Sequence, residues 1–329
     1  MSYYEYMQTF QDRTNFKGDL AELLGEVVGV FQLGTMNSFG VIEMGFEDFN
    51  IKLVTDKGTY LVKVFSKGRS NDQITRYVET IERAISGGVN HPVLHVDARG
   101  NTVFEDHGSS TRLIVTSFIQ GKTFYELSRI PNEQELQAIA GEAVKIHALD
   151  YDPEYVFDGW AIPNMRWMFD KTREHLSPEG LGLVEKAFEY YEAIPFDELP
   201  KCFVHGDLIK TNTILGDDGR VYVIDFAVSN TYPRIQELAV MAANLLFDEK
   251  AKVAVGLKQR VAKAVDAYLK AGGQLTQLEK DNVFNYALPG AAMEYMGSVN
   301  ERITGDTSEE IVYWENLGFN SLKEALGDL

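Results

Sequence analysis

The chain has 329 residues, of which 45% are hydrophobic, and a formal net charge of −18 at pH 7. This length allows two domains with cores of their own, and the apolar content argues against a disordered chain. The strong negative charge makes nucleic acid and anionic membranes poor partners. No apolar run approaches the length of a membrane-spanning helix, and we expect no signal peptide from the first residues.

The single cysteine, Cys202, excludes an intrachain disulfide. We therefore expect a reducing compartment, the cytoplasm. The six histidines do not show the spacing of a structural zinc site, so no such site is expected.

The first third of the chain predicts β-structure. Apolar and polar residues alternate in 49–55 (FNIKLVT), and 59–65 (TYLVKVF) is a mostly apolar run. The turn sequence DKG separates the two segments, which predicts a hairpin. Residues 70–88 then predict a helix, capped by Ser70 or Asn71 and ended by two glycines. The apolar positions of one face at helical spacing are Ile74, Val78, Ile81 and Ile85.

Short strands are predicted near 93–96, 102–105 and 112–118, and the pattern becomes helical after Gly121. We predict an α+β fold with a small β-rich domain at 1–119, an antiparallel sheet with one helix, and a larger helical domain at 120–329. The expected helices cover 131–150, with Pro131 at its start, and 164–176, 178–193, 234–247, 249–271 and 276–297.

One short stretch inside the helical domain is dense in polar residues. Residues 203–226 read FVHGDLIKTNTILGDDGRVYVIDF, which predicts a strand followed by a loop and a hairpin. Asp207 and Asn212 fall on that loop, and Asp225 falls at the end of a hairpin strand. Magnesium prefers oxygen ligands and often takes one or two from the protein, which Asn212 and Asp225 could supply. Asp207 would then be free to accept a proton from a hydroxyl, as phosphoryl transfer requires.

The cation for the donor phosphates is expected from the early sheet. Lys63 is the only charged residue in the apolar strand YLVKVF and needs a partner if it points inward. The following helix offers Glu79 and Glu82. We favour Glu82, because it lies closer to the apolar stripe on a helical wheel.

These segments resemble the aminoglycoside phosphotransferase and choline kinase family, whose members share the protein-kinase fold. The resemblance lies in His-Gly-Asp-Leu-x-x-x-Asn (205–212) followed by Val-Ile-Asp-Phe (223–226), and it extends to YLVKVF, LIVTSFIQGKTF (113–124), AVKIHALD (143–150) and PRIQELAVM (233–241). It implies a bilobal protein with a β-rich N-lobe for nucleotide phosphates and a helical C-lobe. The C-lobe would hold the catalytic and metal loops and the acceptor site.

In the C-lobe, the resemblance implies that Asp207 is the catalytic base and that Asn212 and Asp225 bind Mg²⁺. His205 would support the loop, and Glu237 stands where the family has an aspartate. In the N-lobe, Lys63 would anchor the ATP phosphates with Glu82 as its partner, and the backbone of Ser117 and Ile119 would bind adenine.

Two positions depart from the family pattern. The turn expected over the phosphates, MGFEDFN (44–50), has one glycine, Gly45, and carries Glu47 and Asp48, so it offers few close backbone approaches to phosphate. Lys210 stands where the family often has proline or a small residue; it could contact a transferred phosphate or simply be solvated.

The expected activity is ATP-dependent, Mg²⁺-dependent phosphorylation of a hydroxyl on a small molecule. Aminoglycosides, choline-like alcohols, homoserine and amino sugars remain open as acceptors. Acidic and aromatic residues of the C-terminal region could hold an amine, although the charged outer face of a helix has the same composition. These residues are Glu294, Glu301, Asp306, Glu309, Glu310, Glu315, Tyr295, Tyr313 and Trp314.

Two other functions are compatible with parts of the sequence. A non-catalytic, ATP-binding regulator of kinase-like fold would share the fold but not need Lys63, Asp207 and Asp225, all of which are present. A P-loop nucleotide hydrolase would use Thr116–Thr123, which ends in Gly-Lys-Thr. That segment has Thr116 where the first glycine belongs, and bulky residues where backbone amides should wrap phosphate.

Overall fold

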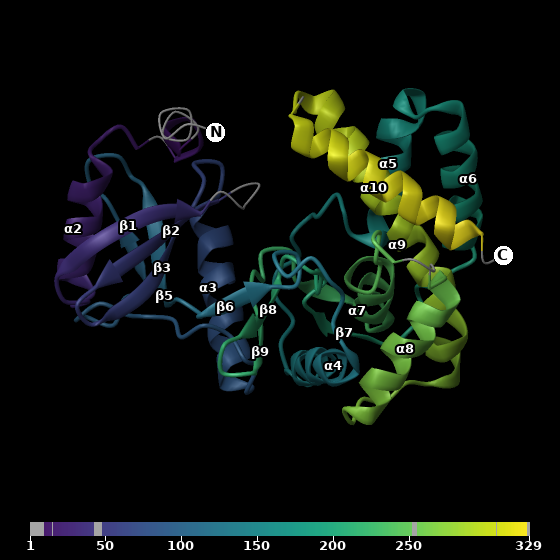
Figure 1. Cartoon of the computed structure of the whole chain (residues 1–329), viewed down its shortest axis with the longest axis horizontal. Coiled ribbons are helices and arrows are strands. Elements are labelled where there is room, and N and C mark those ends of the chain that lie inside the picture. The colour runs from purple at the N-terminus through teal and green to yellow at the C-terminus, as the bar shows by residue number, and fades with distance from the viewer. Residues whose placement is uncertain (1–9, 15, 43–47, 252–254, 307, 328–329) are drawn as a thin grey trace. The chain divides into compact units, whose positions relative to one another are not determined.

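The computed structural model describes residues 10–14, 16–42, 48–251, 255–306 and 308–327. The chain forms two compact units (Figure 1). The first comprises Met1–Ser86 and His91–Gln120, and the second comprises Gly87–Asn90 and Gly121–Leu329. Asn90 belongs with the second unit because its backbone and side-chain N–H groups both donate to Glu142, at 2.8 and 2.9 Å. The assignment of functions to 1–119 and 120–329 stays a prediction.

The first unit is built on a five-stranded antiparallel sheet (Figure 1). The predicted hairpin of 49–55 and 59–65 is confirmed and forms the centre of the sheet. The strand order is β1-β2-β3-β5-β4, with β1 Met36–Ile42, β2 Phe49–Thr55, β3 Gly58–Val64, β4 Val103–Glu105 and β5 Arg112–Ser117.

The side chains of β3 point alternately to the two faces of the sheet, so its core residues and Lys63 lie on opposite faces. Val62 and Val64 are fully buried in an apolar cluster that includes Leu24 and Val27 of helix α2 (Leu20–Val30). Successive side chains of a strand point to opposite faces, so Lys63 lies on the other face of the sheet. Helix α2 was not among the expected elements.

Helix α3 (Asn71–Ser86) agrees with the predicted helix at 70–88. Ser70 caps it, since its Oγ accepts the N–H of Gln73 at 3.2 Å and the Gln73 side chain accepts the N–H of Ser70 at 2.8 Å. The predicted stripe is buried except for Ile85, which is 36% exposed. The strand expected at 93–96 is reduced to one bridge between Leu94 and Thr116.

The second unit contains two small antiparallel sheets. Strand β7 (Lys201–Val204) pairs with β10 (Asn230–Pro233), and β8 (Thr213–Gly216) lies between β6 (Gly121–Thr123) and β9 (Val221–Val223). The Gly-Lys-Thr sequence forms strand β6 and not the turn into a helix that a P-loop requires.

Helices make up most of the second unit (Figure 1). Asn132, and not Pro131, caps α4, because its side chain and that of Glu135 form a reciprocal capping box. A π-helical turn at Met241–Leu245 continues α7 directly. The α-helices are α4 Glu133–His147, α5 Met165–Thr172, α6 Pro178–Glu192, α7 Ile235–Val240, α8 Leu257–Lys270, α9 Gln277–Thr304 and α10 Glu309–Leu326, with 3₁₀ turns at Ile162–Asn164 and Arg173–His175.

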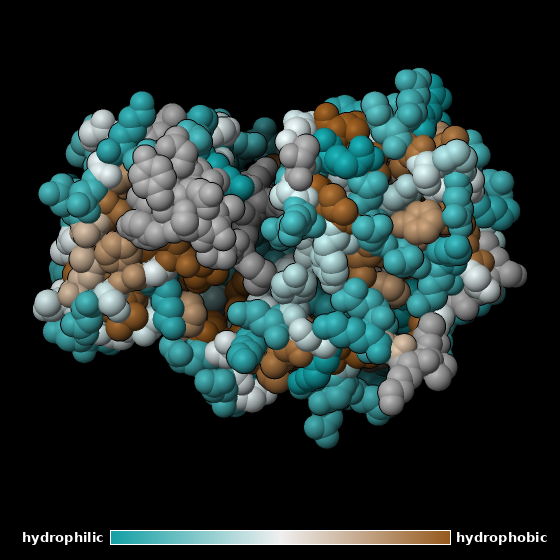
Figure 2. All heavy atoms as spheres, turned by 45° about the horizontal axis from the view of Figure 1, so that its top comes forward, coloured by the Kyte–Doolittle hydropathy of each residue, from teal (hydrophilic) through white to brown (hydrophobic). Residues whose placement is uncertain are grey.

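Charged and polar side chains cover much of the visible surface, with apolar residues in smaller groups between them (Figure 2). This agrees with a charged fraction of 24%. A search of the described helices finds none whose length and hydropathy would let it span a bilayer.

Candidate active site

The site begins where strand β7 ends. Gly206 follows with φ +84°, a left-handed conformation that glycine adopts without strain, and Asp207 comes next. The loop then closes on itself, because the carbonyl of Asp207 accepts the N–H of Ile209 at 2.9 Å. Tyr125, which is not part of the loop, holds it by donating its backbone N–H to the carbonyl of Lys210 at 3.1 Å.

His205 connects this loop to the strand that carries Asp225. Its Nδ1 accepts the N–H of Asp207 at 3.2 Å, and its Nε2 lies 3.1 Å from the carbonyl of Ile224. A carbonyl only accepts, so the ring is neutral with its proton on Nε2. Burial lowers the pKa of His205, in agreement with this form. Both ring nitrogens are therefore used within the protein, which suits a supporting histidine.

Glu237, on helix α7, holds the start of the loop by accepting its backbone N–H groups. Its buried carboxylate accepts the backbone N–H of His205 at 2.7 Å and that of Gly206 at 3.2 Å. Burial acts to raise the pKa of Glu237, but the nearby His147, whose Nε2 lies 3.8 Å from Glu237 Oε2, and the backbone N–H of His205 outweigh it, so the pKa is lowered. An ionised carboxylate is thus fixed at the base of the loop.

Asn212 lies against Asp207. Its Nδ2 donates to Asp207 Oδ2 at 2.6 Å and to the Asp207 carbonyl at 3.1 Å. This geometry directs the amide nitrogen toward the aspartate. The amide oxygen, which is the metal-binding atom of an asparagine, makes no hydrogen bond in the described part of the chain.

Asp225 is brought to the same place by the backbone. The N–H of Ile224 donates to the carbonyl of Asn212 at 3.0 Å, which sets the next residue, Asp225, beside the loop. Asp225 has φ +69°, an uncommon conformation for a residue other than glycine and one often found at functional sites.

The donor set of Asn212 and Asp225 fits magnesium. It supplies one amide oxygen and one carboxylate, the hard ligands that Mg²⁺ prefers, and leaves positions for water and phosphate. Among the described residues, no cluster of three or more His, Cys, Asp or Glu side chains could hold a metal ion. A site with two protein ligands needs no such cluster.

The surroundings of Asp207 are acidic. Burial raises the pKa of Asp207 well above its usual value, and the negative charges of Asp158, Glu294 and Asp225 raise it further. The hydrogen bond from Asn212 acts in the opposite direction. Three carboxylates thus lie close enough to Asp207 to influence its ionisation.

The ionisation of Glu294, on helix α9, is itself perturbed. Burial raises its pKa to about 7, with a further contribution from Asp158 and an opposing one from Asn244, whose Nδ2 donates to Glu294 Oε1 at 2.8 Å. Asn244 lies on the π-helical turn after α7, a feature frequent at functional sites. The sequence suggested Glu294 as an acceptor residue but not Asp158 or Asn244.

An aromatic residue belongs to the same surroundings. Trp160 follows Asp158 by two residues, and its backbone N–H donates to Asp158 Oδ1 at 2.9 Å. The Trp160 ring lies on Gly297 of α9, where an added Cβ would come within 2.3 Å of it. Since Gly297 and Glu294 are three residues apart on one helix, the ring lies on the same helix face as the carboxylate.

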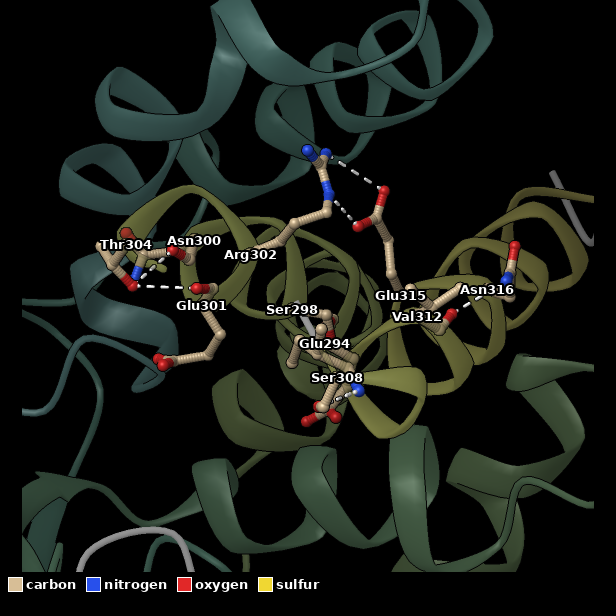
Figure 3. Close-up of polar contacts among 11 residues, drawn as sticks. Glu294, Ser298, Asn300, Glu301, Arg302, Thr304, Ser308, Val312, Glu315 and Asn316 are labelled. Carbon is tan, nitrogen blue, oxygen red and sulfur yellow. Dashed lines mark hydrogen bonds and ion pairs between the residues drawn. The ribbon is translucent and has the colours of Figure 1, made fainter. Parts of the chain in front are cut away.

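Several of the other residues proposed for the acceptor are engaged elsewhere. Glu315 forms an ion pair with Arg302 at 2.6 Å (Figure 3). Glu310 accepts from the Trp314 indole at 3.4 Å, and Tyr313 donates to Glu249 at 2.7 Å. Figure 3 also shows that the carbonyl of Glu294 is used within the helix, by Ser298. Of that set, Glu294 is the one whose charge acts on Asp207.

In the first unit, Lys63 is buried with a different partner from the one expected. Its Nζ lies 3.5 Å from Asp48 Oδ2 and 5.0 Å from the centre of the Tyr77 ring. Asp48 also accepts from Arg69 Nε at 2.8 Å. The predicted pairing with Glu82 is wrong, because α3 turns Tyr77 toward the lysine. Glu82 is exposed and accepts from Thr102 at 3.4 Å.

Of the two residues expected to bind adenine, Ser117 uses its backbone N–H within the protein and Ile119 does not. The N–H of Ser117 donates to the Val93 carbonyl at 2.9 Å, so it is not available to a ligand. Ile119 makes no hydrogen bond within the described ranges, which leaves both of its backbone groups open. Gly45 and Glu47 of the expected phosphate turn lie outside the described residues.

The fold defines the class of protein. Spectinomycin phosphotransferase, solved in complex with ADP and spectinomycin, aligns with a TM-score of 0.68 at 11% identity over 93% of this chain and 97% of that one. A microcompartment-associated aminopropanol kinase aligns with a TM-score of 0.68 at 11% identity, over 93% and 95%. The chain therefore has the kinase-like α+β fold of these small-molecule phosphotransferases, as expected from the sequence.

Residues 39–273, more than half of the chain, match the phosphotransferase enzyme family, APH. The chain belongs to this family, which confirms the resemblance found in its motifs. Among curated proteins, a homoserine kinase of Rhodopseudomonas palustris (strain BisB5) is 22% identical over 214 residues. That match spans 64% of this chain and 64% of the relative, somewhat less than two thirds of its length.

Proposed function

We propose that this protein is a kinase that transfers the γ-phosphoryl group of ATP to a hydroxyl of a small molecule. The observation that carries the proposal is the set of Asp207, Asn212 and Asp225 on two adjoining backbone segments. His205 and Glu237 hold that set through buried hydrogen bonds. Family membership supports the same activity.

Asp207 would orient the acceptor hydroxyl and accept its proton as the new oxygen–phosphorus bond forms. The bond from the γ-phosphorus to the bridging oxygen would break, and ADP would leave with that electron pair. Asn212 and Asp225 would hold Mg²⁺, which when bound neutralises charge on the phosphates. Lys63 would contact the ATP phosphates, and the backbone of Ile119 would receive adenine.

ATP is supported as the donor by the structural relatives. One was solved with ADP and another, an amicoumacin kinase, with AMP-PNP. Because ATP is plentiful in the cytoplasm and the single thiol has no partner for a disulfide, we place the reaction there.

We further propose that the acceptor carries an amine. Glu294 and Asp158 provide negative charge beside Asp207, and the Trp160 ring adds an aromatic face. A carboxylate pair with an aromatic ring suits an ammonium group. Homoserine, the substrate in the names of the curated relatives, has both a hydroxyl and an amine.

The test is a screen for acceptor-dependent ATP consumption over hydroxy amino acids, amino alcohols, aminoglycosides and sugars. Asp207→Asn is the control and should lower turnover by about 10²- to 10⁴-fold while ATP binding is kept. Asp225→Asn should weaken the dependence on Mg²⁺. Normal turnover in Asp207→Asn would reject the assigned base. Tight ATP binding without turnover on any acceptor would instead favour a regulatory protein.

A further inference from the structure

Tyr268, on helix α8, is a buried ionisable side chain that the proposed mechanism does not use. It is 2% exposed, and its hydroxyl lies 2.8 Å from Nδ1 of His147, the last residue of helix α4. In the described part of the chain, this is the only hydrogen bond of the hydroxyl. Gly273 makes room for the ring, because an added Cβ at that position would collide with it. The packing around the ring therefore holds the hydroxyl against His147.

The direction of this hydrogen bond determines where His147 carries its proton. Burial raises the pKa of Tyr268, so the phenol keeps its proton and needs an acceptor. Arg234 and Glu279, two of the charged groups that act on Tyr268, bond to each other through two hydrogen bonds of 2.8 Å. Nδ1 of His147 is left as the acceptor, so the ring is neutral and carries its proton on Nε2.

The protonated nitrogen of His147 faces Glu237. Nε2 is buried and lies 3.8 Å from Glu237 Oε2, and it has no hydrogen bond among the described residues. At this distance the contact is electrostatic, and the positive end of the N–H bond favours the ionised carboxylate. The same oxygen of Glu237 accepts the backbone N–H of His205. The other tautomer would turn a nitrogen lone pair toward the carboxylate, which would repel it.

We propose that Tyr268 is a positioning residue for the catalytic loop and acts through His147 and Glu237. Its hydroxyl holds His147 in the tautomer that presents Nε2–H to Glu237. The carboxylate in turn holds the two backbone N–H groups that precede Asp207. This inference rests on the proposed kinase function. It gives a part in catalysis to helix α8, which supplies no other group to the proposed mechanism.

The first test uses Tyr268→Phe, which removes the hydroxyl and keeps the ring. With ATP and the most active compound of the acceptor screen, kcat should fall by about tenfold, because the loop that carries Asp207 is held less firmly. The KM values for ATP and acceptor should be unchanged. Tyr191→Phe is the matched control, since its hydroxyl donates to the backbone carbonyl of Pro163 at 2.8 Å and not to His147. It should keep the wild-type kcat.

The second test determines the tautomer directly and needs no acceptor. Long-range ¹H–¹⁵N spectra of histidine-labelled protein at neutral pH show which ring nitrogen carries the proton, and the signals of His147 are those missing from His147→Gln. The wild type should show a proton on Nε2 and none on Nδ1. In Tyr268→Phe the Nδ1 signal should move toward that of a protonated nitrogen, because no donor then occupies its lone pair. In the His147→Gln background, Tyr268→Phe should lower kcat no further.

The inference is overturned if Nδ1 of His147 is protonated in the wild type, or if Tyr268→Phe keeps the wild-type kcat. It is also overturned if Tyr268→Phe lowers kcat equally in the His147→Gln background. A Tyr268→Phe variant that loses stability but keeps its kcat when folded would show a purely structural role. If no acceptor drives ATP consumption by the wild type, the kinase proposal fails, and the spectra still decide whether Tyr268 sets the proton of His147.

Discussion

The carboxylate of Glu237 accepts the backbone N–H of His205 at 2.7 Å in the interior of the second unit. This bond joins helix α7 to the end of strand β7, two residues before Asp207. The same carboxylate reaches the N–H of Gly206 at 3.2 Å. The position of the catalytic loop thus depends on a buried charge on a helix that is distant in sequence.

Replacing Glu237 by Gln should destabilise the protein by about 1–3 kcal/mol, because the amide would leave one of the two buried N–H groups without an acceptor. The pKa of Glu237 is lowered, so its contribution to stability is present above about pH 4.5, the ordinary value, and is lost as pH falls through the folded-state pKa. Urea unfolding at pH 7 and pH 4 measures both effects. Equal stability of the two proteins at pH 7 would contradict this role.

Glu294→Gln should have the opposite effect on stability. The pKa of Glu294 is raised to about 7 by burial, so ionising it in the folded protein is unfavourable and stability falls as pH rises from about 4.5 to about 7. The variant should therefore be more stable than the wild type at pH 8, by about 1–3 kcal/mol, and similar to it at pH 4. Unfolding curves at the two pH values decide this, and a variant that is less stable at pH 8 would refute it.

The same substitution should weaken the binding of an amine-bearing acceptor. The groups that face Glu294 are Asp158, Asp207 and Asn244, so an ionised Glu294 adds charge to an already negative surrounding. We expect the acceptor KM of the wild type to fall as pH rises through about 7. In Glu294→Gln the KM should be about tenfold higher at pH 8 and much less dependent on pH. A pH-independent KM in the wild type would argue against an ammonium contact.

Lys63→Met should raise the KM for ATP by at least about tenfold, since it removes the cation proposed for the phosphates. The fold should survive, because Asp48 keeps its hydrogen bonds to Arg69 Nε and to the N–H of Ser66. Lys57→Met, in the exposed turn between β2 and β3, is the matched control. ATP affinity measured by titration calorimetry should change only in the first variant; unchanged affinity in both would remove Lys63 from the site.

Gly297→Ala should disturb the acceptor surroundings without touching Asp207. The new methyl group would come within 2.3 Å of the Trp160 ring and displace the segment that carries Asp158. We expect a higher acceptor KM, with the KM for ATP unchanged. Gly182→Ala on the exposed face of α6, where an added Cβ meets nothing within 4 Å, should instead stabilise the protein by about 0.5–1 kcal/mol. If Gly297→Ala leaves the acceptor KM unaltered, Trp160 does not contribute to acceptor binding.

The sequence predicted the structure well where an element depends on residues that are close together in the chain. The central hairpin of the first sheet follows from alternation and a turn sequence, and the set of Asp207, Asn212 and Asp225 lies within nineteen positions of one loop and hairpin. The prediction that Ile85 belongs to the buried face of α3 was wrong, because that face ends at Ala84 and leaves Ile85 36% exposed. Tyr77 and Ala84 complete the buried face in its place.

By itself, therefore, the chain's order of residues determined most of the strands, most of the helices and the compact catalytic motif, since each depends on hydrogen bonds and side-chain periods between near neighbours. Only the tertiary structure decided that Asp48 neutralises Lys63, and that Asp158 and Asn244 join Glu294 near Asp207. Such contacts arise when apolar faces of distant elements pack together. The partner of a buried charge is then set by which helix faces meet, and no spacing along the chain records that.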